Sequence, residues 1–125
     1  MARELQAVLE PEFEVIATVA DGDAMLEAVD ALCPDVIVTD IVMPRLDGIT
    51  ATAETVRRHP TARIVIATIF DDRETTRAGL AAGARGYVLK SNAAEDLPRA
   101  VRAALRDECH VSPALRRWVA LEEKC

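Results

Sequence analysis

Aromatic residues are scarce in this sequence, whose 125 residues include two Phe, one Tyr and one Trp. The hydrophobic core must therefore be built from Ala, Val, Leu and Ile, which make up most of the apolar half of the chain. Such a composition suits an α/β or an all-α fold. The length is that of one domain with a core of its own.

Basic residues, long apolar segments and closely spaced cysteines are also lacking. Fifteen basic residues stand against 21 acidic ones, and this net charge of −6 disfavours general adhesion to nucleic acid or to anionic lipid. No segment has the length of a membrane span, and residues 1–20 lack the pattern of a secretion signal. Cys33, Cys109 and Cys125 show no C-x-x-C spacing, so we expect free thiols and a cytoplasmic protein.

Short apolar segments alternate with segments of helical periodicity along the whole chain. The pattern predicts helices at 2–10, 23–32, 47–59, 74–83 and 93–106, strands at 13–19, 35–39, 63–68 and 85–90, and a last helix that begins at 112. In this last helix Leu115, Trp118 and Val119 share one face, which we expect to pack on the domain or on a partner. Strict alternation of this kind predicts a parallel sheet covered by helices on both faces.

Polar side chains stand at the ends of three successive predicted strands. Asp40, Thr68 and Lys90 each follow or close a different apolar segment. In an open α/β sheet the binding site lies at the carboxyl ends of the strands, so we expect these three residues to converge. A carboxylate can act as a nucleophile toward phosphorus, while an ammonium and a hydroxyl can stabilise the charged phosphoryl oxygens. The three residues together predict a phosphoryl site.

Three longer motifs surround these residues: "PDVIVTDIVMPRLDG" (34–48), "IVIATIFDD" (64–72) and "GARGYVLK" (83–90). They resemble the motifs of the response-regulator receiver domain of two-component signalling, and most closely those of its NarL/LuxR-type subgroup. The resemblance implies a flavodoxin-like (CheY-like), doubly wound α/β fold with three layers. The resemblance runs from about residue 4 to residue 113 and implies an N-terminally truncated receiver domain at 1–111. It leaves 112–125 as a C-terminal helix or linker, without a DNA-binding domain or nucleic-acid contacts.

The resemblance also implies roles for individual residues. Asp40 matches the acceptor of a phosphoryl group from a histidine kinase or phosphotransfer protein, and Lys90 matches the cation beside it. Thr68 and Tyr87 match the switch residues, which alter the output face formed by segments 74–83, 85–90 and 93–106. Asp40 and the backbone carbonyl of Val42 match ligands of Mg²⁺. No membrane contact is implied, and catalysis would be limited to autophosphatase activity.

One part of the family pattern is absent, namely the first strand and the pair of acids that ends it. This absence leaves a slot between segments 13–19 and 35–39, so the two strands close together, a second chain supplies a strand, or the protein is longer. A homodimer or strand exchange is therefore an open alternative. Mg²⁺ binding would be weak or absent with Asp40 as the one carboxylate. Nearby acids, namely Asp21, Asp23, Asp71 and Asp72, are expected to be turn and helix-cap residues.

Two other functions compete with the phosphoacceptor reading. The first is a phosphorylation-independent pseudo-receiver that acts as a protein-interaction module. The second is a phosphohydrolase with an aspartyl nucleophile, which would place a second Asp two residues after the first as general acid. Val42 occupies that position and argues against an enzyme of this kind.

Overall fold

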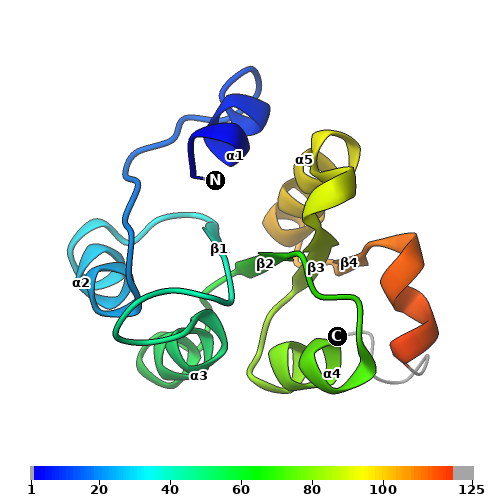
Figure 1. Cartoon of the computed structure of the whole chain (residues 1–125). Coiled ribbons are helices and arrows are strands. Elements are labelled where there is room, and N and C mark those ends of the chain that lie inside the picture. Colours follow the sequence, from blue (N-terminus) through cyan, green and yellow to red (C-terminus); the bar gives the residue numbers. More distant parts are fainter. Residues whose placement is uncertain (1, 120–125) are drawn as a thin grey trace.

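The computed structural model describes residues 2–119 and shows four parallel strands flanked by helices (Figure 1). The strands adjoin one another in chain order, β1-β2-β3-β4. The elements are α1 (Ala2–Leu9), α2 (Gly22–Leu32), β1 (Ile37–Thr39), α3 (Gly48–Arg58), β2 (Ile64–Thr68), α4 (Arg73–Ala81), β3 (Gly86–Leu89), η1 (Lys90–Asn92), α5 (Ala93–Leu105), β4 (His110–Val111) and η2 (Pro113–Trp118), where η denotes a 3₁₀-helix.

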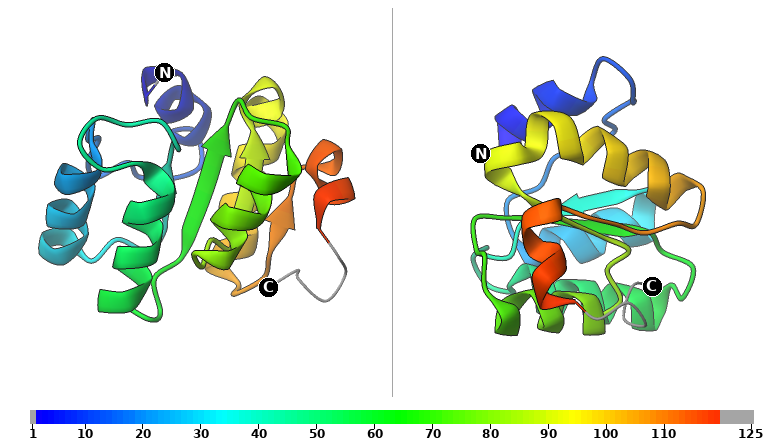
Figure 2. Two further views of the ribbon diagram at one scale, coloured as in Figure 1. Left: turned by 60° about the horizontal axis from the view of Figure 1, so that its bottom comes forward. Right: turned by 90° about the vertical axis from the view of Figure 1, so that its right-hand side faces the viewer.

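The helices form a layer on each side of the sheet, which confirms the predicted three-layer α/β/α fold (Figure 2). Helices α1 and α5 cover one face, and their apolar side chains pack with Val65 of β2 and Val88 of β3. Helices α3 and α4 and the η2 segment cover the other face, where Ile64 and Ile66 of β2 point. Successive residues of β2 therefore enter opposite layers, as the period of two of a strand requires.

Acidic residues begin three of the helices, and two of them, Asp21 and Asp72, are among the acids expected to be turn or cap residues. The side chain of Asp21 accepts a hydrogen bond from the amide of Ala24 at 2.8 Å, at the start of α2. Asp47 and Asp72 do the same at the starts of α3 and α4, at 2.9 and 2.8 Å. Each bond satisfies one of the amides that a helix leaves unpaired at its N-terminus.

The strand predicted at 13–19 does not form, and this prediction is wrong. The segment has no regular secondary structure, and Ile16 and Val19 are 51% and 38% exposed. The sequence favours a strand locally, but a strand is stable only when a neighbour pairs with its amides and carbonyls. Within residues 2–119 the ladder partner of β1 is β2, and no described strand lies between β1 and segment 13–19. The two segments therefore did not close together.

The end of the described chain holds a strand that the sequence pattern did not predict. His110 and Val111 form β4, which pairs in parallel with Gly86 and Tyr87 of β3. A strand of two residues is too short to show a periodicity. The predicted last helix is present as η2, with Leu115 and Val119 buried and Trp118 packed against the same cluster. Any continuation of this helix after residue 119 lies outside the described residues.

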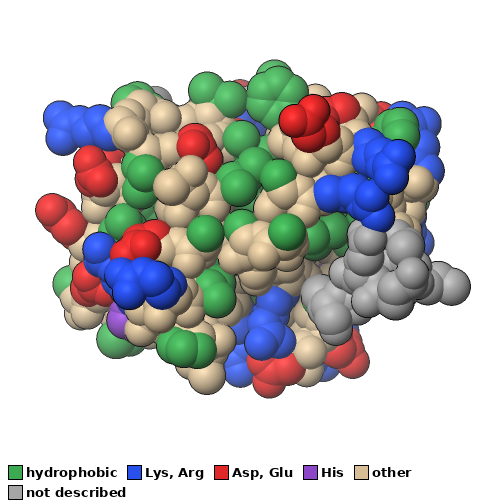
Figure 3. Space-filling view, turned by 90° about the horizontal axis from the view of Figure 1, so that it is seen from below, with side chains coloured by type: hydrophobic (Ala, Val, Ile, Leu, Met, Phe, Trp, Pro, Cys, Tyr) green, Lys and Arg blue, Asp and Glu red, His purple; other side chains and the backbone are tan. Residues whose placement is uncertain are grey.

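The structure bears on two expectations from the sequence, namely the state of the cysteines and the lack of a membrane span. Cys33 is an exposed free thiol, whereas Cys109 is disulfide-bonded, so the prediction of free thiols is wrong for Cys109. Cys125 lies outside the described residues. Among residues 2–119 no helix combines the length and the apolarity that crossing a membrane requires. On the face formed by the lower helices of Figure 1, basic and acidic side chains lie together toward the margins, with hydrophobic and neutral side chains between them (Figure 3).

Candidate functional site

Asp40 follows β1 directly and lies at the carboxyl end of the sheet. Its Oδ1 accepts a hydrogen bond from the next backbone amide, that of Ile41, at 2.7 Å. The loop after it turns back, so that the amide of Gly48 donates to the carbonyl of Ile41 at 2.8 Å. A Cβ atom on Gly48 would lie 1.7 Å from the carbonyl oxygen of Asp40, so only glycine fits there. Gly48 belongs to the motif at 34–48, but the motif gives no sign of this steric role.

Lys90 approaches Asp40 from the end of β3. Its Nζ forms an ion pair with Oδ2 of Asp40. The side chain of Lys90 is 8% exposed and that of Asp40 is 29% exposed, so the cation is the more deeply buried partner. The expected convergence of these two residues is present in the structure. A buried ammonium held beside a partly exposed carboxylate is suited to attract an incoming anion.

Thr68 closes β2, the strand between those of Asp40 and Lys90. Its side chain is fully buried, and its hydroxyl accepts a hydrogen bond from the amide of Phe70 at 3.0 Å. The hydroxyl therefore contacts its own loop in this conformation. The side chain lies on the middle of the three strands, as predicted, and would have to turn to donate to a group on Asp40.

Tyr87 of β3 is buried, with its hydroxyl donating to the carbonyl of Thr75 in α4 at 3.1 Å. Burial raises the pKa of the Tyr87 phenol, and the charge of Asp72 adds to the effect. The ring lies against Gly79 of α4, where a Cβ atom would come within 2.3 Å of Cε2 of the ring. Gly79 thus makes room for the inward ring. The sequence pattern gave no sign of this contact, because the two residues belong to different elements.

The residues present do not form a firm metal site. Within the described part of the chain no three His, Cys, Asp or Glu side chains gather as metal ligands would. Asp21 and Asp72 cap helices, and Asp71 accepts hydrogen bonds from the C-terminal segment. Val42, whose carbonyl is the second predicted ligand, lies in the exposed loop after Asp40 and is 67% exposed. Within residues 2–119 Asp40 would be the one carboxylate available to Mg²⁺, which usually takes more oxygen ligands from protein, water and substrate.

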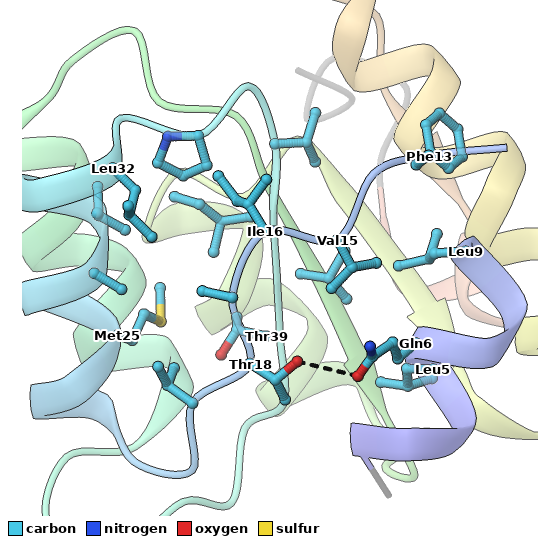
Figure 4. Close-up of a pocket in the computed structure, with 18 of the residues that line it drawn as sticks. Leu5, Gln6, Leu9, Phe13, Val15, Ile16, Thr18, Met25, Leu32 and Thr39 are labelled. Carbon is cyan, nitrogen blue, oxygen red and sulfur yellow. Dashed lines mark hydrogen bonds between the residues drawn. The ribbon is translucent and has the colours of Figure 1, made fainter.

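A cavity of about 660 Å³ opens beside β1 and reaches Asp40. It is lined by apolar side chains of α1, α2 and α5, by segment 13–20 and by β1 (Figure 4). Thr18 and Gln6 are joined across it by a hydrogen bond of 3.2 Å. The amide of Ile37 donates to the carbonyl of Arg63, next to β2. Because successive residues of a strand direct their backbone groups to opposite sides, the amide and carbonyl of Val38 point away from β2. The slot predicted next to this strand is therefore present.

The C-terminal segment occupies part of the predicted output face. Helix η2 packs on α4 and on β3, while β4 extends the sheet beyond β3. The hydroxyl of Ser112 donates to the buried carboxylate of Asp96 in α5 at 2.7 Å and accepts from the amide of Leu89 at 3.1 Å. No local sequence pattern predicts this buried network, since it joins residues that lie far apart in the chain.

Comparison with known proteins gives a family and close relatives. The family model described as "Response regulator receiver domain" matches residues 1–102. The transcriptional regulatory protein DegU of Brevibacillus brevis is 37% identical over 105 residues, which are 84% of this chain and 44% of DegU. The transcriptional regulatory protein LiaR of Bacillus subtilis (strain 168) is 38% identical over 106 residues, 83% of this chain and 50% of LiaR. The chain thus spans about half the length of the curated relatives it matches.

Solved structures show the same fold. A two-component response regulator of the LuxR family from Aurantimonas sp. SI85-9A1 superposes with a TM-score of 0.89 at 29% identity, covering 96% of this chain and 87% of that one. The isolated REC domain of RcsB from Salmonella enterica serovar Typhimurium, solved in the presence of the phosphomimetic BeF3⁻, gives a TM-score of 0.85 at 26% identity. That match covers 95% of this chain and 90% of the RcsB domain.

Proposed function

The chain belongs to the response regulator receiver domain family, and we propose that Asp40 accepts a phosphoryl group from the histidine kinase of a two-component system. The observation that carries the proposal is the ion pair between Lys90 and Asp40 at the carboxyl ends of β3 and β1. It holds a carboxylate nucleophile beside a buried cation, next to the strand that ends in Thr68. The role is signalling, as in the transcriptional regulators that the chain resembles.

In the proposed step a carboxylate oxygen of Asp40 attacks phosphorus and forms a new P–O bond. The P–N bond to the phosphohistidine of the donor breaks, and its electron pair stays on the imidazole nitrogen. The product is an acyl phosphate, a mixed anhydride that carries two negative charges where the Asp40 carboxylate carried one. Lys90 stabilises this charge, and Thr68 turns its hydroxyl toward one phosphoryl oxygen.

The metal is the weakest part of the proposed site. Receiver domains generally bind Mg²⁺ at the phosphorylation site, and here Asp40 and the carbonyl of Val42 would supply its protein ligands. Two ligands give little affinity before a phosphoryl group adds its oxygens. We therefore propose weak Mg²⁺ binding by this chain, measurable as a phosphorylation yield that still rises at high Mg²⁺ concentration.

Labelling with acetyl phosphate tests the proposal directly. The full chain is incubated with acetyl phosphate and MgCl₂, and the phosphorylated species is followed by intact mass and located by peptide mapping after trapping of the acyl phosphate. We expect one phosphoryl group on Asp40, no labelling of the Asp40→Asn variant and unchanged labelling of the matched variant Asp30→Asn on α2. A folded wild-type chain that stays unlabelled at saturating acetyl phosphate contradicts the proposal.

The output of the domain follows from the two switch residues. Thr68 moves toward the phosphoryl group, and the packing of Tyr87 against α4 changes with it. Two packings of the face formed by α4, β3 and α5 then bind a protein partner with different affinity. The phosphoryl donor, whether histidine kinase or phosphotransfer protein, and the partner meet the domain in the cytoplasm.

A second candidate is a phosphorylation-independent pseudo-receiver that binds its partner constitutively. The observation in its favour is the shortage of metal-binding side chains around Asp40 among the described residues. This candidate predicts that a partner binds the wild-type chain and the Asp40→Asn variant equally, with or without acetyl phosphate. A difference of about fivefold or more between these affinities, the low end of typical couplings between sites, excludes it.

A further inference from the structure

The C-terminal segment Pro113–Val119, which we name the cover segment, lies on the face that the proposed function uses as output. Leu115 is fully buried and Val119 is 7% exposed, both in the cluster that contains Tyr87. The beginning of the segment is fixed by Ser112, whose amide donates to the carbonyl of Tyr87 at 2.9 Å. The cover segment is thus part of the domain core at Leu115 and at Val119, and its far end lies beside α4.

The far end of the cover segment is held by Asp71, in the loop between β2 and α4. The indole Nε1 of Trp118 donates to Oδ1 of Asp71 at 2.7 Å, and the guanidinium of Arg117 donates to Oδ2 at 2.8 Å. The Arg117 guanidinium also stacks over the Trp118 ring, 4.6 Å from its centroid. These bonds hold the pKa of the Asp71 carboxyl below its usual value, the bond from Trp118 being the larger cause. Both oxygens of one carboxylate therefore contact the cover segment.

The same loop begins at the proposed switch residue. Thr68 ends β2, its hydroxyl accepts the amide of Phe70, and Asp71 is the next residue. Ile69 and Phe70 are 67% and 36% exposed, so apolar packing does little to fix the loop. The amide that Thr68 holds and the carboxylate that holds Trp118 therefore belong to two consecutive residues, Phe70 and Asp71.

We propose that Asp71 is a latch that ties the cover segment to the state of Thr68, and that phosphorylation of Asp40 opens it. The inference rests on the proposed function and adds the route by which the site reaches its output face. When the Thr68 hydroxyl turns to the phosphoryl group, it gives up the Phe70 amide and loop 69–72 moves. Asp71 then leaves Trp118 and Arg117. The end of the cover segment separates from α4 and exposes a new surface there, while Ser112 and Leu115 keep its start in place.

The latch acts in both directions, because coupling between two sites is reciprocal. If phosphorylation opens the latch, a chain whose latch is already open is phosphorylated more completely at the same concentration of donor. Asp71→Asn removes the charge that both donors share and should raise the labelled fraction of Asp40 at subsaturating acetyl phosphate. Asp30→Asn is the matched control, since Asp30 also contacts two basic side chains, Arg58 and His59, but lies on α2. It should leave the labelled fraction unchanged.

Trp118 is the single tryptophan of the chain, so its fluorescence reports the latch. The first test needs no phosphorylation. Thr68→Val keeps the shape of the side chain but removes the oxygen that accepts the Phe70 amide, and Thr68→Ser keeps that oxygen. We expect emission at longer wavelength for Thr68→Val and for Asp71→Asn, as the indole enters water, and wild-type emission for Thr68→Ser. Wild-type emission from a folded Thr68→Val variant overturns the latch.

The second test uses the wild-type chain with acetyl phosphate, or with beryllium fluoride as a phosphoryl mimic. Intact mass gives the phosphorylated fraction, and Trp118 emission is recorded on the same sample. A shift that grows with the phosphorylated fraction supports the latch. Full labelling with unchanged emission overturns it and leaves the proposed function standing. Absence of labelling, together with a shift in Thr68→Val, overturns the proposed function and supports the link from Thr68 to Trp118.

Discussion

Lys90 and Asp40 are 50 positions apart in the chain and form an ion pair at the carboxyl ends of β3 and β1. The two residues meet because the carboxyl ends of parallel strands lie at the same edge of the sheet. The two partners are unequal, since the Lys90 side chain is almost fully buried and that of Asp40 is nearly one-third exposed. Removing one or the other should therefore have different consequences.

Asp40→Asn should destabilise the fold more than Lys90→Met. The first change leaves a buried ammonium without its anion, which costs about 1.5–3 kcal/mol in the free energy of unfolding. The second leaves a carboxylate that water can reach, with methionine filling the space of the lysine stem. Urea unfolding of both variants and of the double variant gives the coupling energy. Equal losses in the two single variants would contradict the unequal burial of the pair.

Gly79→Ala should displace the Tyr87 ring from α4. Alanine is normally better than glycine in a helix by about 1 kcal/mol, so a gain is expected if nothing touches the new methyl group. The overlap with the ring instead predicts a net loss of about 1–3 kcal/mol. Tyr87→Phe is the control, because it keeps the ring and removes only the bond to Thr75. A stabilised Gly79→Ala variant in thermal unfolding would show that the ring yields without cost.

His110 should make the free energy of unfolding decrease as the pH is lowered from about 6.5. Its Nε2 is buried without a hydrogen bond, 3.7 Å from Oδ1 of Asp96. Burial lowers the pKa of His110 below 6.5, and the charge of Asp96 opposes this shift. The positive charges of Arg116 and Arg99 lower the pKa further. The unfolded chain therefore binds a proton that the folded chain resists, and stability declines as pH falls from about 6.5 through the lower folded pKa.

Thermal unfolding of the wild-type chain and of His110→Gln between pH 5 and 7.5 measures this contribution. The difference between the two should depend on pH only in that window, with the variant showing the flatter profile. Parallel profiles would mean that His110 does not titrate differently in the folded and unfolded states.

Hydrogen exchange should distinguish the edge of the sheet at β1 from its central strands β2 and β3. Amides of residues 14–19 and of Val38 should exchange fast, since the described chain offers them no strand partner. Amides of β2 and β3 should exchange slowly, because these strands are fully buried and paired. Slow exchange in residues 14–19 would point to a strand from a second copy in the cavity beside β1. Light scattering at the same concentration would then show a dimer.

The sequence predicts the residues of the candidate site, but not the glycines that make room for the backbone and side chains around it. Asp40, Thr68 and Lys90 follow apolar strand segments, and strand ends in a parallel sheet share one edge, so local pattern predicts their convergence. Gly48 and Gly79 matter because a backbone oxygen and a tyrosine ring lie where a Cβ atom would stand. Such distances join residues of different elements, and no local pattern encodes them.

The sequence by itself determined the alternation of strands and helices, the helix caps and the identity of the three strand-end residues. These features depend on periodicity, capping side chains and turn residues within a few positions of one another. Tertiary structure alone decided that segment 13–19 stays without a ladder, that β4 joins β3, and that Asp71 holds Trp118. A strand is stable only beside a neighbouring strand, and the contact of Asp71 with Trp118 joins residues far apart in the chain. These outcomes therefore depend on which distant segments the folded chain brings together.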